Sequence, residues 1–178
     1  MKYLICSDIH GSESAARKIV QTFHEEKCSY LILLGDILYH GPRNPLPEGH
    51  NPQGVVEVLN SIASKIIACR GNCDAEVDQM LLKFHMLSDY SFVVDEGIRL
   101  FCTHGHVYEP QNASECDVFL SGHTHIQVLE KNAEGIILCN PGSVSLPKGG
   151  TPAGYAIYCD KVISLYTLEG QKVKSLSF

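Results

Sequence analysis

Side chains that can bind a metal ion occur in five short segments spread over the 178-residue chain. Seven of them are candidate ligands: Asp8, His10, Asp36, Asn72, His104, His123 and His125. Carboxylate, imidazole and amide groups together suit borderline divalent ions such as Mn²⁺, Fe²⁺ and Zn²⁺. Because seven ligands are too many for one such ion, the set indicates two ions that share Asp36 as a bridge.

Each segment taken alone has an ordinary structural explanation. Asp often caps a helix and Gly often opens a turn, so an aspartate just after a strand carries little weight by itself. The paired histidines in His104-Gly105-His106 and His123-Thr124-His125 are less common than a single aspartate after a strand, so they carry more weight. All five segments together, each after a predicted strand, are not explained by caps and turns, and they favour a metal site. Four further histidines are not assigned to metal: His24, His40, His50 and His85.

The first half of the chain supplies the strands that precede three of these segments. Residues 3–6, 30–34 and 66–69 are short continuous apolar runs, which are typical of strands buried on both faces. Apolar residues at helical spacing lie between these runs, over 15–23 and 55–63. Since strand and helix alternate, we predict a βαβαβ unit with a parallel sheet. Ligands bind just beyond the carboxyl ends of such strands.

The second half of the chain is typical of strands joined by turns. A hairpin is predicted where residues 92–94 and 98–103 flank Asp95-Glu96-Gly97. Further strands are predicted at short spacing, the last three as an antiparallel meander: 118–121, 128–130, 136–139, 154–159, 162–168 and 172–176. We therefore predict one α/β domain over residues 1–178, with two stacked sheets and helices outside them.

Composition and charge exclude several classes of protein. The chain is 44% apolar, which excludes a disordered protein, and its net charge of -6 without a basic cluster disfavours a dedicated nucleic-acid binder. No apolar run approaches the ~18 residues of a membrane span. Most cysteines lie in or beside apolar runs and no pair forms Cys-x-x-Cys, so we expect buried thiols rather than disulfides or a cysteine zinc site. These features predict a cytoplasmic protein.

Five short motifs of this sequence resemble those of the calcineurin-like metallophosphoesterases. They are DIHG at 8–11, GD at 35–36, GNCD at 71–74, THGH at 103–106 and GHTH at 122–125. The short chain and three longer segments are similar to the small bacterial YfcE-type phosphodiesterases: LGDILYHGPRNPLPEGH at 34–50, GNCDAEVDQM at 71–80 and NPGSVSLPKGG at 140–150. This resemblance implies a four-layer αββα sandwich, with two stacked mixed sheets flanked by helices and two divalent ions at one edge.

The resemblance also implies which residues bind each ion. One ion would be bound by Asp8, His10, Asp36 and His125, and the other by Asp36, Asn72, His104 and His123. Two such ions would share a hydroxide that attacks phosphorus in line with the leaving oxygen. The implied activity is metal-dependent hydrolysis of small or activated phosphodiesters. Mn²⁺ is the expected cofactor, with Zn²⁺, Fe²⁺ and Mg²⁺ as alternatives.

Cys73 departs from the pattern of the wider superfamily. There, a His follows the Asn of the third motif and assists the leaving group or the transition state. A thiol is a poorer general acid, so Cys73 favours substrates with good leaving groups. The alternative is a packed thiol without a catalytic role.

Three other residues are candidates for contact with the substrate. His106 lies two residues beyond His104, where it could contact the substrate or support a metal ligand. Arg43, in the proline-rich loop 39–52, and Lys148 could hold a phosphate or the leaving group. For all three, a solvated surface side chain is the alternative.

Two other functions are compatible with the same fold. A non-catalytic protein-binding scaffold, such as the retromer subunit, needs no complete ligand set, yet all seven positions here hold competent residues. Phosphomonoesterase activity, as in the Ser/Thr protein phosphatases of the superfamily, is disfavoured by Cys73 and by the lack of an extra substrate domain. We expect no membrane partner, and a homo-oligomer is compatible with the sequence.

Overall fold

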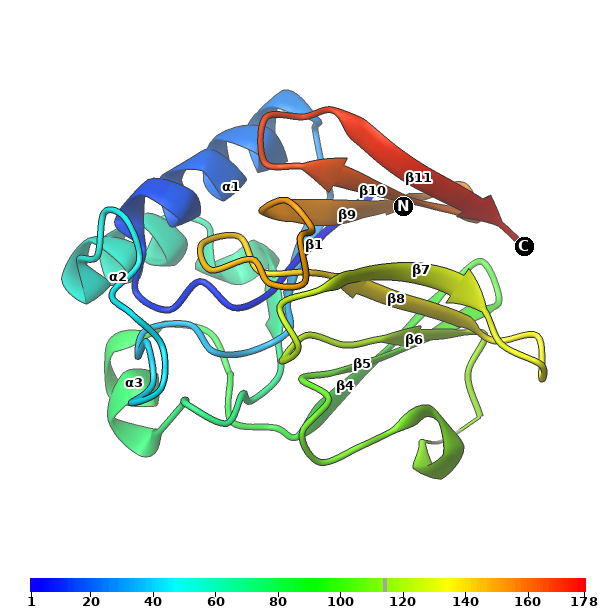
Figure 1. Ribbon diagram of the computed structural model, residues 1–178, viewed down its shortest axis with the longest axis horizontal. Helices are drawn as coiled ribbons and strands as arrows, with labels where there is room; N and C mark the ends of the chain where they lie inside the picture. The colour runs from blue at the N-terminus through cyan, green and yellow to red at the C-terminus, as the bar shows by residue number, and fades with distance from the viewer. Residues whose placement is uncertain (114) are drawn as a thin grey trace.

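A computed structural model describes residues 1–113 and 115–178 and contains two mixed β-sheets, of six and five strands (Figure 1). The strands are β1 (Tyr3–Cys6), β2 (Tyr30–Leu33), β3 (Ile66–Ala68), β4 (Tyr90–Asp95), β5 (Ile98–Thr103), β6 (Val118–Leu120), β7 (Gln127–Lys131), β8 (Ile137–Pro141), β9 (Gly154–Cys159), β10 (Val162–Thr167) and β11 (Lys172–Ser177). The helices are α1 (Glu13–Glu25), α2 (Pro52–Asn60) and α3 (Glu76–Leu81), with 3₁₀ helices η1 (Ala63–Lys65) and η2 (Pro110–Asn112).

The six-stranded sheet has the order β11-β10-β9-β1-β2-β3. Strands β1, β2 and β3 are parallel, as the βαβαβ pattern predicted, and β9, β10 and β11 extend the sheet as an antiparallel meander. The five-stranded sheet has the order β4-β5-β6-β8-β7, in which β5, β6 and β8 are parallel. The predicted architecture of two stacked mixed sheets is therefore confirmed.

The hydrophobic core has two layers because β1 and β2 are buried on both faces. In β1, Leu4 packs toward α1 and α2, whereas the neighbouring Ile5 belongs to the cluster between the two sheets. Both side chains are fully buried. This alternation explains why the sequence of β1 is a continuous apolar run rather than an alternating one. With both faces packed, the strand is held rigidly up to the point where its polar loop begins.

The two outer layers of the sandwich are unequal. Helices α1 and α2 cover the six-stranded sheet, and Ser12 caps α1 by accepting a hydrogen bond from the N–H of Ala15 (3.3 Å). The outer face of the five-stranded sheet is covered in part by residues 108–113 and 115–116, which include η2. There, Tyr108 and Cys116 pack against Phe101 and Phe119. Irregular chain thus replaces an α-helix on this side.

Helix α3 was not predicted from the sequence. It has only six residues, and Val77, Met80 and Leu81 are exposed, so it lacks the apolar stripe that identifies a packed helix. Its first turn is stabilised by the carboxylate of Asp78, which accepts a hydrogen bond from the N–H of Ala75 (2.8 Å). This short helix directly follows the loop that carries Asn72 and Cys73.

All eight cysteines are free thiols, as predicted, and six of them are buried. Within residues 1–113 and 115–178, no helix combines the length and the apolar character that crossing a membrane would require.

Candidate metal centre

The candidate ligands lie in loops that follow the carboxyl ends of strands from both sheets. Asp8 and His10 follow β1, Asp36 follows β2, and Asn72 follows β3 in the six-stranded sheet; His104 follows β5, and His123 and His125 follow β6 in the other. The loops after β1 and β2 are hydrogen-bonded to each other, since the N–H of Asp8 donates to the carbonyl of Gly35 (3.1 Å) and the N–H of His10 to that of Asp36 (3.0 Å). Parallel pairing within each sheet thereby brings distant segments to one edge.

Three imidazoles in this region make the same kind of hydrogen bond to the backbone. In each, Nδ1 lies against a backbone carbonyl: His10 against Tyr39 (2.8 Å), His104 against Leu34 (2.6 Å) and His125 against Leu146 (2.6 Å). A carbonyl only accepts hydrogen bonds, so Nδ1 must carry the proton. In the neutral ring, Nε2 then holds a lone pair, which is the arrangement found in metal-binding histidines. All three rings are buried.

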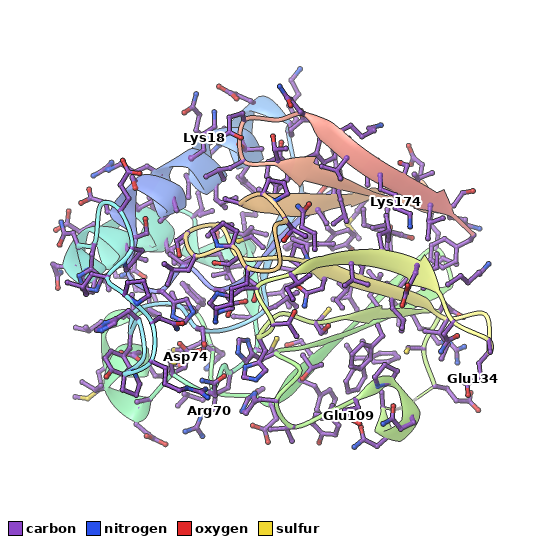
Figure 2. The ribbon with its side chains drawn as sticks, viewed as in Figure 1. Lys18, Arg70, Asp74, Glu109, Glu134 and Lys174 are labelled. Carbon is purple, nitrogen blue, oxygen red and sulfur yellow. The ribbon has the colours of Figure 1, made fainter. Side chains whose placement is uncertain are left out.

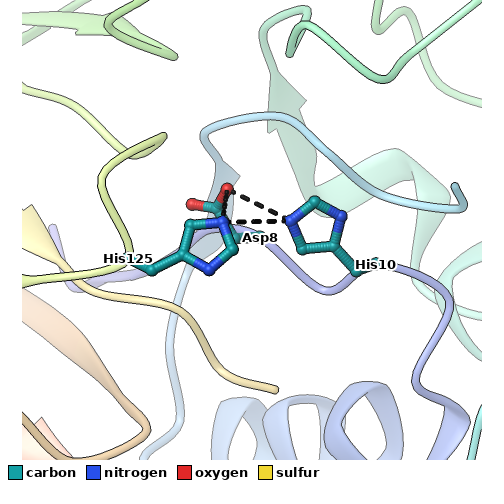
Figure 3. A group of neighbouring side chains, drawn as sticks. All are labelled: Asp8, His10 and His125. Atoms are coloured by element: carbon teal, nitrogen blue, oxygen red, sulfur yellow. Dashed lines mark hydrogen bonds and ion pairs between the residues drawn. The ribbon is translucent and has the colours of Figure 1, made fainter. Parts of the chain in front are cut away.

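Figure 3 shows Asp8, His10 and His125 converging on one point. The Nε2 atoms of His10 and His125 are 3.2 Å apart, and Oδ1 of Asp8 lies 3.5 Å from the first and 3.2 Å from the second. Oδ1 is buried and has no hydrogen-bond partner within the described residues. Three electron-rich atoms therefore face one another with no donor between them if both rings are neutral. Such a set fits a divalent cation.

A second group of acceptors lies on the other side of Asp36. The Nε2 of His104 is 3.4 Å from Oδ2 of Asp36 and 3.1 Å from Oδ1 of Asn72. Oδ2 of Asp36 is also 3.7 Å from Nε2 of His10. Asp36 thus lies between the two groups of acceptors, where a bridging ligand would have to be.

The charges of these groups depend on one another. Burial disfavours the ionised carboxylates, but contacts with the imidazoles hold the pKa of Asp8 and of Asp36 below the usual range. Burial also opposes charge on the rings, yet the bond to Asp36 raises the pKa of His104 to about 9, and Asp8 raises that of His10. Without a metal ion, protons on the rings would balance the carboxylates. A divalent cation would take over this role.

The backbone is strained at most of these positions. Asp8, His10, Asp36, His123 and His125 all have positive φ, between 51° and 67°. This left-handed conformation costs a residue with a Cβ roughly 1–2 kcal/mol. Strain of this kind persists where the surrounding structure enforces it, and it concentrates at functional sites.

Asp74 is a supporting residue to which sequence analysis assigned no role. Its buried carboxylate accepts hydrogen bonds from the backbone N–H groups of Asp36 (2.8 Å), Ile37 (2.9 Å) and Gly71 (2.7 Å), and it lies between α3 and the sheets (Figure 2). Burial raises its pKa to about 6, although the three N–H donors stabilise the ionised form. Asp74 therefore fixes the loop after β2 to the loop after β3. The only sign of this role in the sequence was that Asp74 is the last residue of the GNCD motif at 71–74.

The segment 140–146 supports the ligands of the other loops. The hydroxyls of Ser143 and Ser145 both donate to the carbonyl of Asp8, at 2.7 and 3.0 Å. The amide of Asn140 donates to the carbonyl of Gly122 (2.7 Å), next to His123. This segment therefore restrains the first and last metal-binding loops.

A cavity of about 440 Å³ opens onto the centre. It is lined by two of the predicted substrate contacts, Arg43 and Lys148, together with Cys73 and His123. Arg43 and Lys148 are exposed, and Nζ of Lys148 donates to Oδ1 of Asn44, which also lines the cavity (3.3 Å). These cations are thus placed where an anionic substrate would enter.

The structure does not bring His123 or His106 into the acceptor groups. The backbone N–H of His123 donates to Oδ2 of Asp8 (3.1 Å), but its ring is partly exposed and lies beside His104, with 5.1 Å between ring centroids. The exposed ring of His106 lies 5.3 Å from that of His104. Burial and then the nearby His104 lower the pKa of both rings, which favours neutral imidazoles facing the solvent.

Cys73 lies next to Asp36. Its backbone N–H donates to Oδ1 of Asp36 (2.8 Å), and Nδ2 of Asn72 lies 3.2 Å from its sulfur. Burial, followed by the charge of Asp36, raises the pKa of the thiol to about 12.

The chain is similar in sequence and in fold to known proteins. A family model described as the calcineurin-like phosphoesterase superfamily domain matches residues 1–160. Phosphodiesterase YfcE of Escherichia coli K12 is 48% identical over 176 residues, which cover 97% of this chain and 95% of that protein. A solved structure of YfcE, a phosphoesterase from E. coli, has a TM-score of 0.95 and 46% identity over 99% of both chains. Vacuolar protein sorting 29 from Cryptosporidium parvum has a TM-score of 0.65 and 18% identity, over 99% of this chain and 98% of that chain, which shows a shared fold alone.

Replacing His123 by glycine should stabilise the metal-free protein relative to replacement by alanine. Its φ of 67° strains any residue with a Cβ, so we expect His123→Gly to exceed His123→Ala by about 1 kcal/mol in the free energy of unfolding. Urea unfolding with a chelator present measures the difference. The control is Thr124, which is not among the residues with positive φ and where alanine should be the more stable replacement. The same order of stability at both positions would refute the assignment of strain.

Proposed function

Because the chain belongs to the calcineurin-like phosphoesterase superfamily, as its motifs predicted, we propose that it is a metal-dependent phosphodiesterase acting on small or activated phosphodiesters. The observation that carries the metal dependence is the orientation of the imidazoles. Nε2 atoms of His10, His104 and His125 point at buried carboxylates, with their Nδ1 atoms already bonded to backbone carbonyls. The near full-length likeness to phosphodiesterase YfcE supports the reaction.

We propose two divalent ions in this centre, with Mn²⁺ as the expected metal. The ligands would be Asp8, His10, Asp36 and His125 for one ion, and Asp36, Asn72, His104 and His123 for the other. His123 would have to turn its ring toward His104 to take part. Bound ions of this kind polarise a phosphoryl group and lower the pKa of water, so no protein nucleophile is needed.

The side chains of the cavity would bind and orient the substrate. Arg43 offers a planar fork of donors and Lys148 a point charge, both suited to phosphoryl oxygens. His106 does not line the cavity but lies beside His104, and it stays a candidate for contact with the substrate. Cys73 lines the cavity beside Asp36 and would lie near the leaving oxygen. A cavity of about 440 Å³ suits a small diester.

The alternatives are less well supported. A protein-binding scaffold has no need for imidazoles locked in one tautomer around buried carboxylates. Phosphomonoesterase activity remains disfavoured because a thiol stands where an imidazole would assist an alkoxide leaving group. We also propose that residues 1–178 act as one domain in the reducing cytoplasm, which the eight free thiols support.

The purified protein should bind close to two divalent ions, and chelation should abolish hydrolysis of an aryl phosphodiester. The reason is that removal of the ions removes both the activated water and the charge that stabilises the transition state. Metal analysis at saturating Mn²⁺, together with turnover before and after chelation, tests this. Finding one ion or none, with no density between Asp36 and Asn72, would rule out the two-ion model.

Asp36→Asn should be the most damaging change of a single ligand. Asp36 lies between both groups of acceptors, so its loss weakens both ions, whereas His125→Ala weakens one directly. We expect turnover of an aryl diester to fall by several orders of magnitude for Asp36→Asn and by less for His125→Ala. Asp160→Asn, a surface change remote from the centre, is the control. Higher activity in Asp36→Asn than in His125→Ala would contradict the bridging role.

A thiol at position 73 should limit turnover of substrates with poor leaving groups. General acid catalysis typically contributes about 10²–10⁴-fold and matters most for alkoxides. With a thiol at position 73, aryl diesters should be hydrolysed readily and alkyl diesters slowly. Cys73→His should raise the rate ratio of alkyl to aryl substrates. The measurement is turnover against the pKa of the leaving group, and a flat dependence in the wild type would show that another proton donor already acts.

A further inference from the structure

The sulfur of Cys73 lies with two candidate metal ligands. His10, Asp36 and Cys73 each offer one donor atom, and the three atoms lie within 4.8 Å of one another. Among the described residues, no other cysteine belongs to such a group. The sulfur therefore has a place in the centre that packing alone does not require.

Two hydrogen bonds hold Cys73 at the edge of the centre. The backbone of Cys73 is bonded to Asp36 (2.8 Å), and the amide of Asn72 donates to the sulfur (3.2 Å). Gly41 leaves room for the sulfur, because a Cβ at that position would lie 3.1 Å from it. Cys73 also lines the main cavity, so the sulfur is reachable from solvent. These contacts orient it toward His10 and Asp36 and leave it accessible to an incoming ion.

A second observation at the same centre indicates a cation. Oδ1 of Asp8 is fully buried, lacks a hydrogen-bond partner within the described residues, and lies 3.5 Å from Nε2 of His10. His10 therefore belongs to two groups of donor atoms, one with Asp8 and His125 and the other with Asp36 and Cys73. An ion held by His10 and Asp36 would have an oxygen donor and a sulfur donor both available to it.

We propose that Cys73 is a conditional metal ligand, which joins His10 and Asp36 around thiophilic divalent ions such as Zn²⁺ and Cd²⁺ and not around Mn²⁺. Thiolates select soft ions, whereas carboxylates and water suit Mn²⁺. When the metal–sulfur bond forms, the thiol gives its proton to solvent, so this bond adds one proton to those that the imidazole rings release on metal binding. A sulfur bound to metal cannot protonate a leaving group. The ion present would therefore decide whether Cys73 is free to contact the substrate.

This inference rests on the proposed metal centre. Spectra of the protein loaded with Co²⁺ test the metal centre and the ligand role of Cys73 separately. Co²⁺ bound to protein gives visible d–d bands, and a thiolate ligand adds a charge-transfer band in the near ultraviolet. We expect both in the wild type, and in Cys73→Ser the d–d bands alone. Cys159→Ser, which removes the other partly exposed thiol, is the matched control and should keep the charge-transfer band.

Affinities measured by competition provide the second readout. Cys73→Ser should weaken Cd²⁺ binding by about 10-fold to 100-fold, the range typical for loss of a partner at a metal site, and leave Mn²⁺ affinity unchanged. Co²⁺ d–d bands without charge transfer in the wild type would overturn the role of Cys73 and leave the metal centre intact. Failure of the wild type to bind Co²⁺ at all would overturn both.

Discussion

The centre is governed by repulsion between lone pairs. The Nε2 atoms of His10 and His125 face each other at 3.2 Å. Both lie close to Oδ1 of Asp8, a buried carboxylate oxygen that accepts no hydrogen bond within the described residues. Backbone carbonyls already occupy both Nδ1 atoms, so neutral rings cannot rotate to relieve this contact without losing a buried hydrogen bond. A proton or a metal ion must therefore lie among these atoms. The surrounding structure is arranged to keep them together.

Two features of the fold counteract this unfavourable arrangement. The doubly buried strands β1 and β2 hold the starting points of the ligand loops, and the carboxylate of Asp74 ties the loop of Asp36 to that of Gly71. The left-handed backbone at Asp8, His10 and Asp36 adds strain that binding of a cation would offset. The metal-free protein is thus less stable than it could be, because its ligands are already held in place before the ion binds.

Much of this could be predicted from the sequence because its signals are local. Apolar runs that are followed within two residues by Asp8, Asp36 or His104 identify strands and the polar loops after them. The role of Asp74 could not be found this way, since a carboxylate that accepts three backbone hydrogen bonds has no pattern in the sequence around it. The same is true of Ser143, whose partner is 135 residues away. Helix α3 was missed because its apolar side chains are exposed instead of packed.

The most direct test of the central claim is the protonation of the histidine rings. Nitrogen-15 NMR of the protein loaded with diamagnetic Zn²⁺ distinguishes Nδ1 from Nε2 in each ring. We expect His10, His104 and His125 to carry their proton on Nδ1 and to bind metal through Nε2. A proton on Nε2 in any of the three would contradict it, because the backbone carbonyls could then not be what orients the centre.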